Sequence, residues 1–355
     1  MTTRRQVTLG QYLLETLDTA DAEQADLHTL LTDVALGCKA VAQRIAMGAL
    51  APAVDASQAP TPGGPSSPEQ VSHEIIVRAA EWRGNVAAMS SKCHELPYVV
   101  PRRGTRGRFL LCFDPLDGSV NVDVNVTVGS VFSILRAPAV DRDPTVDDFL
   151  QCGTRQVCAG YAVYGPSTML LLTVGRGTHG FTLDHALGEW VLSHESIRVP
   201  DGTHEFAINA SNSRYWPLAV RRYVDECLAG ATGPRHAEFT MRWIASLVAE
   251  AHRILMRGGV FLYPRDSRDP SRPGRLRLLY EANPIAFLIE QAGGVASTGQ
   301  ERVCDLLPSA LRQRVGLIFG AADEVRRIER YHREDPGDAF ASPLFGRRGL
   351  FASTD

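Results

Sequence analysis

Lysine is nearly absent from this chain of 355 residues. Of its 37 cationic residues only Lys39 and Lys92 are lysines, so arginine carries almost all of the positive charge. The net charge is −3 at pH 7, which leaves no basic footprint for nucleic acid or an anionic membrane surface as a partner. With so few lysines, the position of Lys92 next to a candidate site becomes informative.

Long hydrophobic runs and paired cysteines are missing as well. No window approaches the run of about 18 apolar residues typical of a transmembrane helix, so we expect no membrane span. The first residues lack the uninterrupted apolar region of a secretory signal. The seven cysteines are odd in number, scattered, and contain no C-x-x-C pair. Reduced thiols in a cytoplasmic protein are the interpretation that fits best.

The length predicts about two domains, and 44% apolar residues supply ample core material for them. Helical periodicity covers residues 8–49 and 69–81, whereas residues 108–175 show mostly strand patterns. A second α/β region follows. We therefore expect an N-terminal domain over 1–198 and a C-terminal domain over 199–335.

Helix signals in the second region predict two further helices. One is expected over 243–256, ending before Gly258-Gly259, and the other begins with Asn283 as N-cap and Pro284 at the first helical position. Two segments rich in proline and glycine lie outside these elements. Residues 50–68 are predicted to form a mobile loop and residues 336–355 a frayed tail.

The segment Gly175-Arg-Gly-Thr-His-Gly180 matches the dinucleotide-binding pattern G-x-G-x-x-G. That fold requires a helix to open at the glycine-rich loop. Here Phe181-Thr-Leu-Asp184 has a strand pattern, so a glycine-rich hairpin is the better interpretation.

The segment Asp114-Pro-Leu-Asp-Gly-Ser119 follows directly after the apolar run 108–113. Its two carboxylates, Asp114 and Asp117, are separated by a proline that restricts the backbone. Mg²⁺ is usually held by one or two carboxylates together with substrate phosphate, and glycine lets backbone N–H groups approach that phosphate. The motif therefore predicts a metal-and-phosphate corner at a strand end. The alternative is a strand-terminating turn with solvated aspartates.

Five ordered blocks of sequence carry a resemblance to a known family. The blocks are Phe113-Asp-Pro-Leu-Asp-Gly-Ser with Asn121-Val-Asp-Val-Asn125, Ala159-Gly-Tyr-Ala-Val-Tyr-Gly-Pro-Ser-Thr168, Met241-Arg-Trp-Ile-Ala-Ser-Leu-Val248, Gly259-Val-Phe-Leu-Tyr-Pro264 and Arg275-Leu-Arg-Leu-Leu-Tyr-Glu-Ala-Asn-Pro284. Together they resemble the class 1 fructose-1,6-bisphosphatases, within the Mg²⁺-dependent, lithium-sensitive phosphomonoesterases. The resemblance implies a layered α/β/α/β/α sandwich of two domains that assembles into homotetramers.

The resemblance also implies the residues of a site. Catalytic Mg²⁺ would be held by Asp114, the carbonyl of Leu116, Asp117 and Glu281. Backbone N–H groups from Asp117 to Val120, through Gly118 and Ser119, would bind the phosphate being removed. The second phosphate and the sugar would be bound by Asn209, Arg242, Tyr263 and Arg275, with Arg242 reaching into a neighbouring subunit. Taken without the family, Glu281 has the alternative interpretation of a charge near a helix start, and Arg242 and Arg275 that of solvated or salt-bridged cations.

The sequence departs from the family pattern in two places. The family's mobile catalytic loop ends in an aspartate needed for catalysis, and here the corresponding residue is Glu69. The family's Ser-Glu-Glu, which supplies carboxylates for metal binding and water activation, aligns with Ser91-Lys92-Cys93. A lysine has donors and no acceptor, so a metal ligand has been replaced by a cation.

Three functions remain open on the sequence. The first is Mg²⁺-dependent hydrolysis of the 1-phosphate of fructose 1,6-bisphosphate, in gluconeogenesis or Calvin-cycle type carbon metabolism, with Lys92 standing in for one metal. The second is a weak or inactive paralogue that binds sugar phosphates or assembles with an active subunit. The third is a related phosphatase acting on another phosphate ester, which the blocks after residue 205 disfavour.

Inhibition by AMP, common in the family, is expected to be weak or absent. The family binds the inhibitor's phosphate at a helix N-terminus whose glycine permits close backbone approach. Here the turn reads Gln24-Ala25-Asp26-Leu27, which adds a Cβ, and a supporting Lys-Tyr pair has become Arg108-Phe109.

Overall fold

The structure is a computed structural model that describes residues 6–50, 67–102, 104, 106–137, 142–269 and 273–334. Most of the predicted mobile loop, residues 51–66, lies outside these ranges, and so does the predicted tail over 336–355. All seven cysteines are unpaired. Within the described ranges, no helix combines the length and hydrophobicity that a membrane crossing requires.

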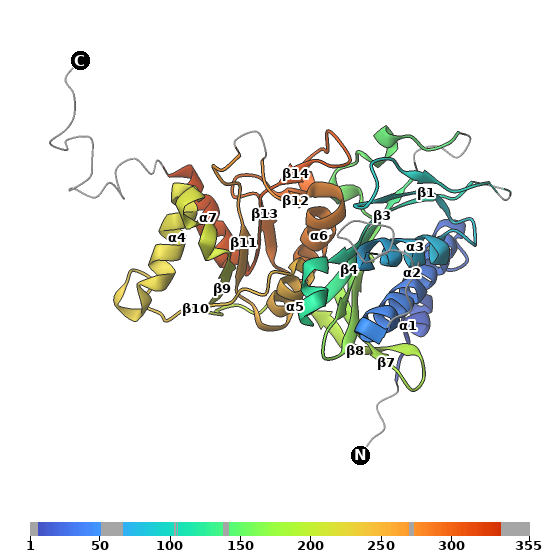
Figure 1. Ribbon diagram of the computed structural model, residues 1–355, viewed down its shortest axis with the longest axis horizontal. Helices are drawn as coiled ribbons and strands as arrows, with labels where there is room; N and C mark the ends of the chain where they lie inside the picture. The colour runs from blue at the N-terminus through green and yellow to red at the C-terminus, as the bar shows by residue number, and fades with distance from the viewer. Residues whose placement is uncertain are drawn as a thin grey trace.

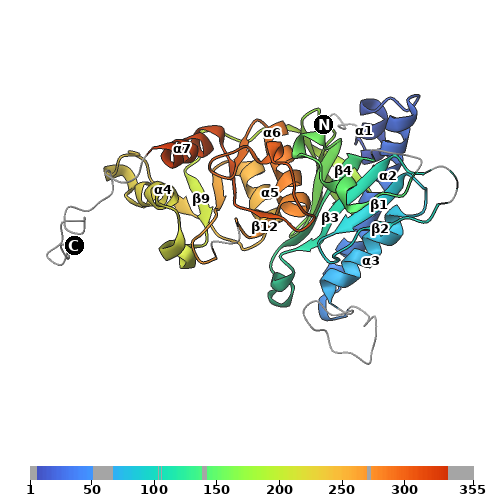
Figure 2. The same ribbon diagram turned by 90° about the horizontal axis from the view of Figure 1, so that it is seen from above.

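The chain folds into five layers, helices alternating with two sheets (Figure 1). Figure 2 shows the same order of layers from above. The outer helical layer on the N-terminal side contains α1 (Leu9–Thr16), α2 (Ala22–Ala46) and α3 (Pro68–Ala80). The central layer contains α5 (Leu247–Arg257) and α6 (Asn283–Gln291), and the other outer layer contains α4 (Leu218–Leu228) and α7 (Ala322–Arg333). The predicted α/β/α/β/α sandwich is confirmed, whereas the boundary at residue 199 stays a prediction.

The larger sheet has eight strands in the order β2-β1-β3-β4-β5-β6-β7-β8. The strands are β1 (Val86–Ser91), β2 (Tyr98–Val99), β3 (Phe109–Asp117), β4 (Val128–Arg136), β5 (Cys158–Tyr164), β6 (Thr168–Thr173), β7 (Thr178–Asp184) and β8 (Glu189–Ile197). Strand β1 is parallel to β3, and the other neighbours are antiparallel. Every residue of β3 is buried, because helices cover both faces of the sheet.

The smaller sheet has five strands in the order β10-β9-β11-β15-β13. They are β9 (Glu205–Ile208), β10 (Thr240–Met241), β11 (Val260–Tyr263), β13 (Val295–Ser297) and β15 (Leu317–Gly320), and a separate pair joins β12 (Leu276–Arg277) to β14 (Arg314–Val315). The central helices α5 and α6 bury apolar side chains against both large sheets, so one core connects the two halves of the chain.

The glycine-rich segment 175–180 is a hairpin, as predicted. Gly175 and Gly177 have φ values of +81° and +86°, and they connect the antiparallel strands β6 and β7. No helix opens at this loop, which excludes the dinucleotide-binding interpretation.

Two predicted helix starts are wrong. Helix α5 begins at Leu247 rather than residue 243, because Ala245 has a φ of +60° and Glu250 accepts a hydrogen bond from the Ile244 amide at 2.8 Å. Ser246 is its N-cap. At α6, Asn283 is not the N-cap, because a π-helical turn over Leu278–Ala282 runs directly into the helix.

Candidate metal and phosphate site

A bulge at the end of β3 brings the two aspartates of the motif together. Asp114 pairs with Val131 of β4 and Asp117 with Gly129, so β3 holds one more residue than β4 between these pairs. In a regular strand, residues three apart point to opposite faces, and one extra residue returns them to the same face. Pro115 lies inside the bulge, where it need not donate to the ladder, and its carbonyl accepts a hydrogen bond from Ser130 at 2.6 Å.

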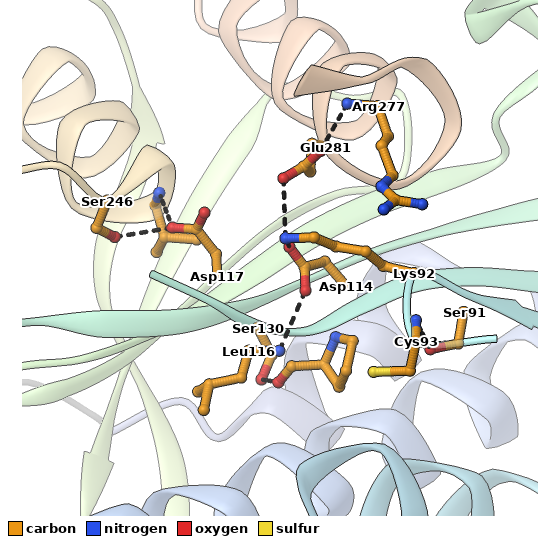
Figure 3. A network of polar contacts seen from close by, with 12 residues as sticks. Ser91, Lys92, Cys93, Asp114, Leu116, Asp117, Ser130, Ser246, Arg277 and Glu281 are labelled. Atoms are coloured by element: carbon orange, nitrogen blue, oxygen red, sulfur yellow. Dashed lines mark hydrogen bonds and ion pairs between the residues drawn. The ribbon is translucent and has the colours of Figure 1, made fainter. Parts of the chain in front are cut away.

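Three carboxylates converge at this bulge. Asp114, Asp117 and Glu281 each offer an oxygen, and these atoms lie within 4.8 Å of one another. Asp114 is fully buried, while Asp117 and Glu281 are each 5% exposed. Glu281 lies on the π-helical turn before α6, far along the chain from the two aspartates, and its carboxylate points toward theirs (Figure 3).

A backbone N–H group holds one oxygen of each carboxylate (Figure 3). Asp114 Oδ1 accepts from Leu116 at 3.3 Å, and Glu281 Oε2 accepts from Arg277 at 2.6 Å. Asp117 Oδ2 accepts from the amide of Val248 at 2.9 Å and from the hydroxyl of Ser246 at 2.8 Å. The other oxygen of each carboxylate accepts none of these backbone hydrogen bonds and can contact a cation.

Lys92 extends into the middle of these carboxylates. Its Nζ lies 2.8 Å from Asp114 Oδ2 and 3.1 Å from Glu281 Oε1. Burial lowers the pKa of Lys92, but the charges of Asp114, Glu281 and Asp117 outweigh that effect and raise the pKa well above its ordinary value. Burial raises the pKa of Asp114, and the ammonium beside it opposes that rise. Lys92 is therefore a charged ammonium.

The donor set fits a hard divalent cation. Carboxylate and carbonyl oxygens are the ligands that Mg²⁺ prefers, and three carboxylates held in fixed orientations form such a set. The loop continues into a 3₁₀ turn over Ser119–Val124, whose first N–H groups have no carbonyl partner within the turn. Gly118 has a φ of +71°, a conformation that favours glycine. Val120 is 79% exposed, so this turn faces solvent.

Three of the four predicted sugar-phosphate residues line one pocket. Asn209, Tyr263 and Arg275 surround it together with Asn212 and Asp266. Asn209 directly follows β9 and caps the short turn over Ala210–Tyr215, and Tyr263 is the last residue of β11. The pocket therefore lies at the carboxyl ends of these two strands.

Arg242, the fourth predicted residue, lies outside that pocket. Its Nε is 3.5 Å from Glu205 Oε1, and its side chain is 48% exposed. The ring of the neighbouring Trp243 lies 6.0 Å from the Tyr263 ring, centroid to centroid.

Glu69 lies at the start of α3, next to Cys93. Ser67 is the N-cap of this helix, and Glu69 falls in its first turn, where a negative charge is favoured. Burial, followed by the charge of Glu69, raises the pKa of the Cys93 thiol, which favours its protonated form.

The sequence prediction missed the residues that orient the carboxylates. Ser246 lies inside one of the matching blocks but was counted as helix interior, although a serine before an apolar run is a recognised N-cap signal. Ser130, beneath Pro115 and bonded to the Tyr164 hydroxyl at 2.8 Å, had no local signal.

Comparisons with known proteins agree on one family. Residues 7–195 match the family model described as "Fructose-1-6-bisphosphatase, N-terminal domain", and residues 199–333 match its C-terminal counterpart. The chain is 58% identical to "Fructose-1,6-bisphosphatase class 1 3" of Methylibium petroleiphilum over 99% of both chains. It is 55% identical to "Fructose-1,6-bisphosphatase class 1" of Hydrogenophilus thermoluteolus over 97% of both.

A solved structure has the same fold. The crystal structure of Leishmania major fructose-1,6-bisphosphatase in holo form is 31% identical, with a TM-score of 0.83, and the match covers 93% of this chain and 100% of that one. Sequence and structure together show that the chain belongs to the class 1 fructose-1,6-bisphosphatase family.

Proposed function

We propose that this chain hydrolyses the 1-phosphate of fructose 1,6-bisphosphate to give fructose 6-phosphate and phosphate. The observation that carries this is the near full-length identity of 58% and 55% to two class 1 fructose-1,6-bisphosphatases. The buried cluster of Asp114, Asp117 and Glu281 supports it, because the carboxylates of a metal site are retained. Nothing in these comparisons favours an inactive paralogue.

Mg²⁺ is the proposed cofactor, held by Asp114, Asp117, Glu281 and the carbonyl of Leu116. When bound, it would polarise the phosphoryl group and lower the pKa of an attacking water. The protein's own contribution is orientation, since backbone N–H groups fix one oxygen of each carboxylate before any ion arrives.

Recognition of substrate is proposed for two further groups of residues. Backbone N–H groups of Gly118, Ser119 and Val120 hold the phosphate being removed. The sugar and its other phosphate are bound by Asn209, Tyr263 and Arg275, with Arg242 supplied by a neighbouring subunit. Glu69 is the proposed catalytic carboxylate of the loop before α3. Asn209, Tyr263 and Arg275 lie close together around one small hollow, which supports their assignment to the sugar and its other phosphate.

A cytoplasmic homotetramer is the proposed assembly. The family resemblance is its basis, and the half-exposed Arg242 is the residue proposed to reach a neighbouring subunit. Sedimentation of the purified chain tests the tetramer directly, and Arg242→Ala should raise the KM for substrate if the neighbour's site depends on it.

Phosphate release from fructose 1,6-bisphosphate at millimolar Mg²⁺ tests the activity. We expect release that EDTA abolishes and added Mg²⁺ restores, with fructose 6-phosphate as the sugar product. Faster release from another phosphate ester would indicate a related phosphatase, and no release from any ester would indicate the inactive paralogue.

A further inference from the structure

Lys92 lies among the carboxylates of the acidic cluster, and the proposed reaction gives it no role. We infer that its ammonium is a resident cation that takes the place of one divalent ion between Asp114 and Glu281. The inference deepens the proposed function and rests on its metal site. It predicts that this chain binds one divalent ion fewer than the same site without the lysine.

The fold delivers Lys92 to this position from a neighbouring strand. Strand β1 ends at Ser91, and the Lys92 amide donates to the Phe113 carbonyl at 3.1 Å, immediately before Asp114. Because β1 and β3 are parallel, their carboxyl ends meet at the same edge of the sheet. The lysine backbone is therefore anchored next to the aspartate that its side chain contacts.

The contacts of Lys92 occupy the oxygens that an ion would use. Asp114 and Glu281 each give one oxygen to a backbone N–H and the other to Nζ, at 2.8 and 3.1 Å. Among the described residues, Asp117 Oδ1 is the carboxylate oxygen of this cluster without a hydrogen-bond partner. The remaining ion is therefore expected at Asp117 Oδ1, and Asp114 and Glu281 would share their oxygens between this ion and Lys92.

Charge balance leads to the same conclusion. Three carboxylates and one ammonium sum to −3 + 1 = −2, which a single Mg²⁺ neutralises. A neutral residue at position 92 would leave −3, and a glutamate would leave −4, which calls for a second ion. Because the side chain of Lys92 is only 22% exposed, water screens its repulsion of a neighbouring divalent ion weakly.

Counting bound ions tests the inference. Mn²⁺ serves as the probe, with free Mn²⁺ measured by electron paramagnetic resonance for the wild-type chain, Lys92→Met and the matched control Lys39→Met. Lys39 is the chain's other lysine and lies away from the site, where its Nζ is 3.5 Å from Glu189. We expect Lys92→Met to bind one more ion per chain than the wild type, and Lys39→Met to match the wild type. Equal counts in all three would overturn the inference.

A second measurement needs no variant. Because the sequence contains only two lysines, a chain labelled with ¹⁵N at lysine Nζ gives two side-chain signals, and Lys39 serves as the internal reference. We expect the Lys92 signal to remain distinct from that of free lysine at saturating Mg²⁺. A shift to the free-lysine position would mean that the metal displaces the ammonium, and the inference would fail.

Phosphate release separates this failure from that of the proposed function. A wild-type chain that hydrolyses fructose 1,6-bisphosphate with Mg²⁺, yet shows the same ion count as Lys92→Met, disproves only the role of Lys92. A wild-type chain that binds no Mn²⁺ and releases no phosphate disproves both.

Discussion

The acidic cluster and the pocket lined by Asn209, Tyr263 and Arg275 hold their polar side chains in different ways. In the cluster, the carboxylates of Asp114 and Glu281 are at most 5% exposed and each is fixed by a backbone N–H group. In the pocket, Arg275 is exposed, Tyr263 is half-buried, and the side chain of Asn209 accepts a hydrogen bond from its own turn, from the Ser211 amide at 3.1 Å.

This difference has a physical reason. A buried carboxylate is costly to desolvate, so it persists only with a cation and hydrogen bonds, and these also orient it for chemistry. The exposed Arg275 needs no such compensation and keeps the freedom to adjust to the proposed sugar phosphate. This difference agrees with the proposed roles of the cluster as a metal site and of the pocket as a site for the sugar and its other phosphate.

Asp114→Asn should have the largest effect, because it removes a buried ligand charge from the centre. We expect kcat for fructose 1,6-bisphosphate to fall on the order of a thousandfold, since a metal supplies several kcal/mol of transition-state stabilisation. Phosphate release at saturating Mg²⁺ measures this, with the exposed Asp201→Asn as control. Activity within tenfold of wild type would show that Asp114 is not a ligand in turnover.

Ser246→Ala tests whether the hydrogen bond that orients Asp117 contributes to metal binding. The variant loses the 2.8 Å hydrogen bond to Asp117 and the N-cap of α5, which is bonded to the Ala249 amide. We expect Mn²⁺ affinity to fall about 10- to 100-fold and the free energy of unfolding to fall by about 1 kcal/mol. Ser246→Thr keeps both hydroxyl contacts and should restore both values. Lost stability with unchanged ion affinity would limit Ser246 to capping.

Arg275→Ala tests the pocket side of the comparison. Loss of a charge-assisted hydrogen bond of about 1.5–3 kcal/mol should raise KM by roughly 10- to 100-fold. The change in kcat should be much smaller, because the reacting phosphate lies elsewhere. Arg275→Lys keeps the charge without the planar guanidinium, so its KM should lie between those of the wild type and Arg275→Ala. A kcat loss as large as that of Asp114→Asn would erase the distinction between the two regions.

The smallest expected effect is that of AMP on phosphate release. A pocket at the N-terminus of α2 is lined by Arg136 and Arg176. Arg176 donates to the Thr16 carbonyl at 2.9 Å, whereas Arg136 and the nearby Arg108 are paired with carboxylates. Arg136 Nε lies 2.6 Å from Glu23, and Arg108 Nε lies 3.0 Å from Asp26. We expect no change in phosphate release at micromolar AMP, whereas Glu23→Gln with Asp26→Asn should free both cations and strengthen binding. Sub-micromolar binding to the wild type in calorimetry would contradict this prediction.

Local patterns predicted most of the secondary structure. Periodic apolar residues located α1 to α3, and the strand pattern after Gly180 identified the hairpin of β6 and β7. The start of α5 was missed because the positive φ of Ala245 is stabilised by the contact of Glu250 with the Ile244 amide, not by any local preference of alanine.

By itself, the sequence determined the family, the layered fold, and the presence of two carboxylates at the end of a strand. Only the tertiary structure decided that these carboxylates share a face, because that depends on the bulge between β3 and β4. It also decided that Glu281 and Lys92 meet them, since Glu281 lies on a turn far along the chain and Lys92 on a parallel strand. Contacts between residues distant in sequence depend on strand pairing and layer packing, which no local pattern encodes.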